Sequence, residues 1–213
     1  MAGTPVKRTA ARRGRPGYDL ESLLSVAVAE FTERGFDGTS MEDLSRKLGI
    51  SKSAIYHHVP SKDELLRLAV NRGLDGLFAE VATLDTIDGR AIDKLEYLVR
   101  ASVGVLVEQL PFVTLLLRVR GNTNVERAAL ARRKEFDQIV SDLVSTAITE
   151  GDLRPDVDPH ISARLLFGMI NSITEWYRPN GGITSAALAD SVTAVAFTGL
   201  RRTPRADTTP TPG

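Results

Sequence analysis

Cysteine is absent from this chain of 213 residues, and histidine occurs at only three positions. The absence of cysteine excludes a disulfide framework and thiolate chemistry. Three histidines without any cysteine also give no pattern of the kind that holds a zinc ion. We therefore predict neither a metal site nor a bound cofactor.

Motifs of the common enzyme classes are missing as well. The chain has no glycine-rich phosphate loop, no G-x-S-x-G nucleophile motif and no paired motif at metal-binding spacing. Isolated carboxylates in helices are expected of solvated faces. We therefore predict no catalytic residues. An enzyme is kept as a competing hypothesis, which turnover of an acyl-CoA by the purified protein would revive.

The chain also lacks an unbroken apolar run of the length that spans a membrane. Its most apolar stretch, from Ala101 to Val119, is interrupted by Glu108, Gln109 and Pro111. The N-terminus is basic but has no apolar core, so it does not read as a secretory signal. These absences predict a cytoplasmic protein with no membrane partner.

Acidic residues are missing from the N-terminal segment. Lysine plus arginine and aspartate plus glutamate balance at 27 each, but five basic residues precede Asp19, the first acidic one. These are Lys7, Arg8, Arg12, Arg13 and Arg15. Such an arm suits an anionic partner, or a tail that only aids solubility. Its segment 12–16, RRGRP, resembles the core of an AT-hook, so minor-groove insertion, loose attraction to phosphates and no role are all open.

Most of the remaining sequence has the spacing of amphipathic helices. The first segment shows it in Leu20, Leu23, Leu24, Ala27, Val28 and Phe31. Capping boxes at Ser40 (or Thr39) and at Ser61 predict the starts of a second and a fourth helix. Further helices are predicted near residues 88–109, 111–119, 123–150, 158–178 and 184–202. No segment alternates as a strand does, so we predict an all-α fold of about nine helices.

Composition divides the chain into four parts. Residues 1–17 form a basic arm and residues 203–213 a threonine- and proline-rich tail, both expected to be disordered. Residues 18–64 are predicted to form a compact three-helix bundle. Residues 65–202 are predicted to form a larger helical domain.

The segment ISKSAIYHHVPSK, residues 50–62, predicts a helix-turn-helix. Ser51 is a good N-cap, and Pro60 ends the short helix that follows. The turn before it contains Gly49, and two short helices joined by such a turn are typical of this motif. Only Ile55 and Val59 in the short helix clearly require a core. Its polar side chains therefore suit the major groove, where donors and acceptors read base edges.

Residues 29–66, AEFTERGFDGTSMEDLSRKLGISKSAIYHHVPSKDELL, resemble the TetR family of transcriptional regulators nearly position by position. The resemblance implies a nine-helix fold and binding to a palindromic operator in double-stranded DNA, hence association with the nucleoid. The DNA contacts it implies are Ser40, Ser51, Lys52, Ser53, Tyr56, His57, His58 and Lys62. For His58, half-buried support of Val59 is an alternative.

The resemblance also implies a homodimer formed by the last two helices, about residues 158–202. Apolar stripes there include Ile161, Leu165, Leu166, Met169, Ile170 and Ile173, and then Leu188, Val192, Val195, Ala196 and Leu200. Gly168, Ala194 and Gly199 would permit close approach. The alternative is that these stripes face the core of their own chain.

The middle helices should enclose a site for a small-molecule effector. The predicted ligand-binding residues are Leu95, Val99, Val103, Phe112, Leu116, Arg118, Arg120, Phe136, Val140, Trp176 and Arg178. Arginines beside apolar helices suit phosphate or carboxylate capture, or else form a solvated basic face. Residues 168–184, GMINSITEWYRPNGGIT, are similar to a segment of TetR-like regulators that sense acyl-CoA thioesters.

An acyl-CoA-released repressor is therefore the predicted function. A repressor that responds to another hydrophobic or aromatic molecule is the first alternative. A ligand-independent DNA-binding protein is the second, although DNA binding alone needs only the first third of the chain.

Overall fold

The computed structural model describes residues 19–201, and this part of the chain is helical, as predicted. The helices are α1 (Leu20–Arg34), α2 (Met41–Leu48), α3 (Lys52–His58), α4 (Lys62–Thr83), α5 (Ala91–Glu108), α6 (Leu110–Arg118), α7 (Asn124–Glu150), α8 (Pro159–Trp176) and α9 (Ser185–Leu200), with a 3-10 turn η1 (Leu84–Thr86) after α4. The basic arm and the C-terminal tail lie outside the described residues.

Side-chain caps set where most helices begin. At Ser40, the hydroxyl accepts from the N–H of Asp43, whose carboxylate accepts from the N–H of Ser40, which completes a capping box. Ser51 and Ser61 cap α3 and α4 through their hydroxyls. Each cap satisfies backbone donors that a helix start leaves free, and typically contributes about 1 kcal/mol.

Two hydrophobic clusters form the core. The first holds the buried faces of α1, α2 and α3, together with residues from α4 and α6. The second holds the buried faces of α5, α7, α8 and α9. Helix α4 takes part in both, because Leu65 to Leu74 belong to the first cluster and Leu77, Phe78 and Val81 pack against the second. One continuous helix therefore connects the two parts of the protein.

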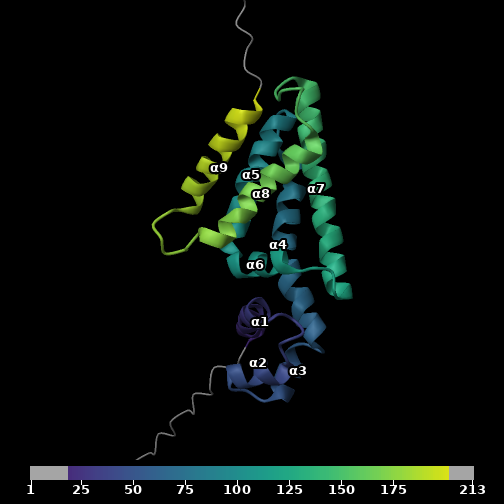
Figure 1. Ribbon diagram of the computed structural model, residues 1–213, viewed down its shortest axis with the longest axis vertical. Coiled ribbons are helices and arrows are strands. Elements are labelled where there is room, and N and C mark those ends of the chain that lie inside the picture. Colours follow the sequence, from purple (N-terminus) through teal and green to yellow (C-terminus); the bar gives the residue numbers. More distant parts are fainter. Residues whose placement is uncertain (1–18, 202–213) are drawn as a thin grey trace, which may run out of the picture.

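Figure 1 shows how these parts are arranged. Helices α1, α2 and α3 form a small body at one end, which we call the reading head. Helices α5, α7, α8 and α9 form the larger regulatory body at the other end. Short α6 crosses between them, with α1 on one side and the C-terminal end of α8 on the other.

Within residues 19–201 no single helix is long and apolar enough to cross a membrane. Helices α5 and α6 reach that length and apolar character only as a pair, and that pair is bent by 99°. Both helices contribute side chains to the core clusters.

Candidate nucleic-acid interface and effector cleft

Helices α2 and α3 are joined by a tight turn at Gly49. Gly49 has a φ of 66° and is left-handed, a conformation in which glycine avoids the strain of a Cβ atom. Its N–H donates to carbonyls of the last turn of α2. The turn lets Leu48 and Ile55 enter the same core cluster, so that α2 and α3 form a fixed pair.

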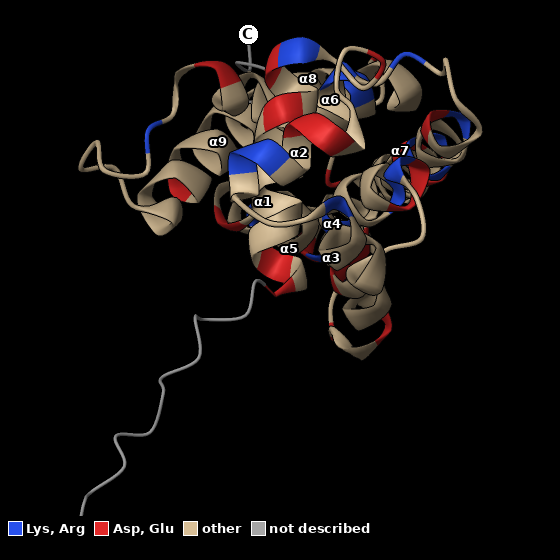
Figure 2. Ribbon diagram, turned by 90° about the horizontal axis from the view of Figure 1, so that it is seen from below, with Lys and Arg blue, Asp and Glu red and all other residues tan. Residues whose placement is uncertain are grey.

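The outer face of α3 is open to solvent. Ile55 is fully buried and holds the helix to the core, whereas Tyr56 is 46% exposed. The other exposed predicted contacts on this helix and its cap are Ser51, Lys52, Ser53, His57 and His58. His58 is exposed, so it is not a half-buried support for Val59. The predicted reading residues of α3 are thus all open to solvent. Figure 2 views the reading head from its own end of the molecule.

Lys62 has a structural role that the sequence did not indicate. Its Nζ donates to the carbonyl oxygens of Phe36, at 2.8 Å, and Thr39, at 2.9 Å, and lies 4.2 Å from the centre of the Phe36 ring. These contacts tie the start of α4 to the loop before α2. An ammonium has three donors, so one is left for a DNA phosphate.

Ser40 is similarly engaged within the reading head. Its hydroxyl donates to the carboxylate of Asp43 at 2.5 Å. Hydrogen bonds from Ser40 and the nearby Arg46 and Arg34 hold the pKa of Asp43 below its usual range. The Ser40 hydroxyl is therefore already part of a charged cap at the N-terminus of α2.

The predicted effector residues do not form one site in this structure. Leu95, Val99, Val103, Phe136 and Val140 are packed into the core of the regulatory body. Phe112 and Leu116 belong to the cluster of the reading head. Trp176 is half exposed at the end of α8. Helical periodicity indicates that these positions are apolar, but it does not show which side chains each one contacts.

Arg118 and Arg120 are neighbours in sequence but have different surroundings. Nη1 of Arg118 donates to the carbonyl oxygen of Thr32 in α1 at 2.7 Å. Beyond Arg118, the backbone N–H groups of residues 120–122 all donate to Oε2 of the buried Glu126, at 2.7–3.2 Å. The carboxylate of Glu126 therefore already fills the anion-binding turn beside Arg120.

Arg118 and Arg178 line a common cleft. The cleft has a volume of about 450 Å³ and lies between α1, α6 and the residues that follow α8. Its walls are the side chains of Ser25, Val28, Ala29, Thr32, Glu33, Leu110, Pro111, Thr114, Arg118, Thr174, Tyr177, Arg178 and Pro179. The cleft is thus bounded by the reading head on one side and by the regulatory body on the other.

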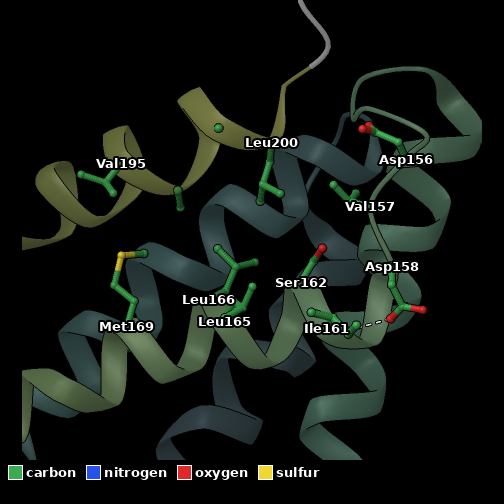
Figure 3. A pocket seen from close by; sticks show the side chains of 12 residues that line it. Asp156, Val157, Asp158, Ile161, Ser162, Leu165, Leu166, Met169, Val195 and Leu200 are labelled. Carbon is green, nitrogen blue, oxygen red and sulfur yellow. Dashed lines mark hydrogen bonds between the residues drawn. The ribbon is translucent and has the colours of Figure 1, made fainter.

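A second groove, of about 500 Å³, runs between α8 and α9. Leu165, Met169 and Leu200 line it, as Figure 3 shows. Leu165 is 70% exposed and Val195 is 69% exposed, which is unusual for large apolar side chains. The predicted apolar stripes of α8 and α9 are therefore only partly exposed. The members that lie in the core cluster of their own chain are Leu166, Ile170, Ile173, Leu188, Val192 and Ala196.

Two protein-family models match this chain. The model described as "Bacterial regulatory proteins, tetR family" matches residues 23–69, which cover most of α1 and all of α2 and α3. The model described as "Tetracyclin repressor-like, C-terminal domain" matches residues 88–200. Together they cover both the reading head and the regulatory body.

Individual proteins are similar over most of the chain. A solved TetR-family regulator of Streptomyces coelicolor A3, SCO3833, is 55% identical, with a TM-score of 0.79 over 86% of this chain and 92% of its own. The transcriptional repressor KstR2 of Mycobacterium tuberculosis (strain H37Rv) is 26% identical over 84% of this chain and 92% of its own length. The solved complex of AibR with isovaleryl coenzyme A and operator DNA is 26% identical, with a TM-score of 0.69 over 83% of this chain and 97% of its own.

Proposed function

We propose, on the premise that this chain belongs to the TetR family of bacterial transcriptional regulators, that it is a dimeric repressor which a small molecule releases from a palindromic operator. Proteins of this family are DNA-binding regulators and not enzymes. The observation that carries the proposal is the solvent-facing polar surface of α3 on a buried Ile55. Such a helix suits the major groove, with Lys52, Ser53 and His57 as base readers.

A palindromic operator requires two reading heads related by two-fold symmetry. We assign the dimer contact to the exposed apolar face of α8 and α9, which includes Ile161, Leu165 and Val195. Within residues 19–201, a Cβ added at Gly168 or Gly199 would have no atom of another helix within 4 Å, so both positions leave room for a partner helix. A second copy of the same face would cover these side chains as a four-helix bundle.

We propose that the effector is an acyl-CoA thioester. AibR, which is similar over most of this chain, has been solved with isovaleryl coenzyme A and operator DNA together. Arginines that flank an apolar cleft supply the charge-assisted donors that a CoA phosphate requires. To release DNA, the effector must bind more tightly to a conformation whose heads do not match the two half-sites.

The test is to titrate the repressor–operator complex with a panel of acyl-CoAs, with their free acids and with neutral aromatic compounds. The operator is first identified by selection from randomised DNA. Release by thioesters at lower concentration than by the matching acids supports the proposal. Release only by free acids or neutral aromatics would show that the effector is not a CoA thioester. Release by none of these compounds would favour a ligand-independent DNA-binding protein.

A further inference from the structure

The cleft between α1, α6 and the end of α8 has the features of a binding site for an organic anion. Its volume of about 450 Å³ lies in the range of small-molecule sites. Val28, Ala29 and Leu110 give it apolar wall, and Arg118 and Arg178 give it two guanidinium groups. Glu33 is the acidic side chain in its lining, so the charge that faces the cleft is positive on balance.

Neither arginine is neutralised by a carboxylate within the described part of the chain. Arg118 donates from Nη1 to the Thr32 carbonyl, and Arg178 donates from Nη1 to the carbonyl of Tyr177 at 2.9 Å. Other exposed arginines behave differently, for example Arg154, which pairs with Asp156 at 2.6 Å. A guanidinium has five N–H donors, so both arginines retain donors for a ligand.

Thr32 adds a second, independent observation. Its hydroxyl oxygen is shielded from solvent and has no hydrogen-bond partner among residues 19–201. A buried hydroxyl without a partner costs free energy, and such groups call for an explanation when they occur in a native fold. Here it belongs to a residue that lines the cleft, and the carbonyl of the same residue holds Arg118.

We infer that this cleft holds the anionic end of the effector, an inference that rests on the proposed function. Arg118 and Arg178 bind a carboxylate or phosphate group, and the surface of Val28, Ala29 and Leu110 covers the adjoining apolar part. Free acids and CoA thioesters share this chemistry, so either can be the source of the anion.

The position of the cleft explains how binding there would reach the DNA. One wall is α1, which packs with α2 and α3 in the cluster of the reading head. The opposite wall is formed by α6 and the residues after α8. An anion that draws Arg118 away from the Thr32 carbonyl would weaken a direct bond between α1 and α6. A change in the angle of the reading head would then also shift α1 against Phe112, Leu115 and Leu116 of α6, which lie in the same core cluster.

The experiment compares Arg118→Gln, Arg178→Gln and Ala29→Phe with the intact protein. Arg120→Gln is the matched control, because Arg120 belongs to the same basic stretch but does not line this cleft. Short- and medium-chain acyl-CoAs, the matching free acids and coenzyme A alone are titrated by calorimetry without DNA, and then against the operator complex. Arg118→Lys separates loss of charge from loss of fold, and circular dichroism checks the helices of every variant.

We expect each of the three cleft variants to weaken anion binding by about tenfold or more, as loss of a charge-assisted hydrogen bond or of the space for the ligand implies. Arg120→Gln should stay within about twofold, and Arg118→Lys should recover part of the loss. Binding by the free acids but not by coenzyme A would identify a carboxylate as the group that the arginines hold. Binding by coenzyme A that carries no acyl group would identify a phosphate.

Two results would contradict the assignment of the effector's anionic end to this cleft. The first is unchanged binding in all three cleft variants while the thioesters still release DNA, which leaves the proposed function intact. The second is the absence of calorimetric binding by every anion in the panel. Arginine-dependent binding without any release of DNA would instead support the cleft and contradict effector-controlled repression.

Discussion

Nζ of Lys47, on the surface of α2, lies 2.6 Å from Oε1 of Glu30, a carboxylate of α1 that is only 2% exposed. Arg34 approaches the other oxygen of the same carboxylate at 3.4 Å. A buried charge is tolerated only when it is paired, because its removal from water is costly. The Lys47–Glu30 bridge therefore links α2 to α1, whereas the Arg34–Glu30 bridge lies within α1 itself.

Lys47→Ala should lower the free energy of unfolding by about 1–3 kcal/mol, since Glu30 then stays buried with Arg34 as its remaining ionic partner among residues 19–201. The control is Arg46→Ala on the same helix, whose bridges to Glu42 and Asp43 are more exposed and should contribute at most about 0.5 kcal/mol. Chemical denaturation followed by circular dichroism measures both. Equal effects of the two substitutions would show that burial of Glu30 has no energetic consequence.

Lys52→Ala or His57→Ala should change base preference, by about 1–3 kcal/mol at the base pair that each side chain contacts. Lys62→Ala should weaken binding to all sequences alike, because phosphate contacts carry no base information. Lys62→Ala should also lower stability, because the carbonyls of Phe36 and Thr39 lose a charged donor. Selection from a randomised operator library, with Lys134→Ala on α7 as control, tests the first two statements. Identical selected sequences for all variants would contradict the role assigned to α3.

Val195→Glu should convert the proposed dimer into monomers and abolish tight operator binding. A carboxylate at this 69% exposed position would be desolvated in the apolar face of a second copy. Val192 is not a suitable site for this test, because it is 6% exposed and a charge there would disrupt the chain's own core. Sedimentation equilibrium, with the exposed Thr146→Glu of α7 as control, measures the change. Tight operator binding by a demonstrably monomeric variant would refute the dimer assignment.

Asp137→Asn should stabilise the protein at neutral pH. Partial burial raises the pKa of Asp137, and the nearby Arg133 and Arg164 offset this only in part. The folded state therefore binds the proton of this carboxyl more tightly than the unfolded state does, so the intact protein gains stability relative to the variant as the pH falls. The advantage of Asp137→Asn should shrink between neutral pH and the usual range of an aspartate. An advantage that is constant with pH would rule out a raised pKa as its cause.

Gly49→Ala and Gly104→Ala should have opposite effects. Gly49 is left-handed with a φ of 66°, so a Cβ there strains the backbone and should cost about 1 kcal/mol. Gly104 lies within α5, and in the described part of the chain a Cβ there would have no atom of another helix within 4 Å. Alanine should therefore stabilise α5 by about 0.5–1 kcal/mol. Thermal unfolding of the two variants side by side measures the difference, and a stabilising Gly49→Ala would contradict the turn geometry.

The helices could be predicted well from the sequence because their ends are encoded locally. Ser40, Ser51 and Ser61 each cap the helix that follows, and Gly35 and Gly49 follow the ends of α1 and α2. Capping depends on residues within three or four positions, so it is legible in a single sequence. The short turn η1 and the bridge between Leu153 and Arg201 carry no such signal and were not predicted.

The surface of α3 was also predictable, because a helix with one deeply apolar residue must expose its other faces. Ile55 is buried and Tyr56 is exposed, as the pattern indicates. The engagement of Lys62 by Phe36 and Thr39 was missed, because those residues are 26 and 23 positions away.

The cleft that we propose for the effector could not be found from the sequence. Thr32 and Arg118 are 86 positions apart, and nothing in either segment indicates that they meet. Helical periodicity shows that Phe112 and Val140 face inward, but it does not show that they belong to different clusters. Only the packing of α6 between the two bodies decides which of these side chains can share a ligand.

If the bond from Arg118 to the Thr32 carbonyl couples the effector to the operator, the two must weaken each other's binding reciprocally. If an effector at Arg118 loosens the hold of the protein on its operator, then the operator must loosen the hold on the effector by the same factor. Each DNA site would then set its own threshold, because a tighter operator raises the effector concentration needed to vacate it. A single repressor could in this way switch on several promoters in sequence, from the weakest operator to the strongest, as the effector accumulates.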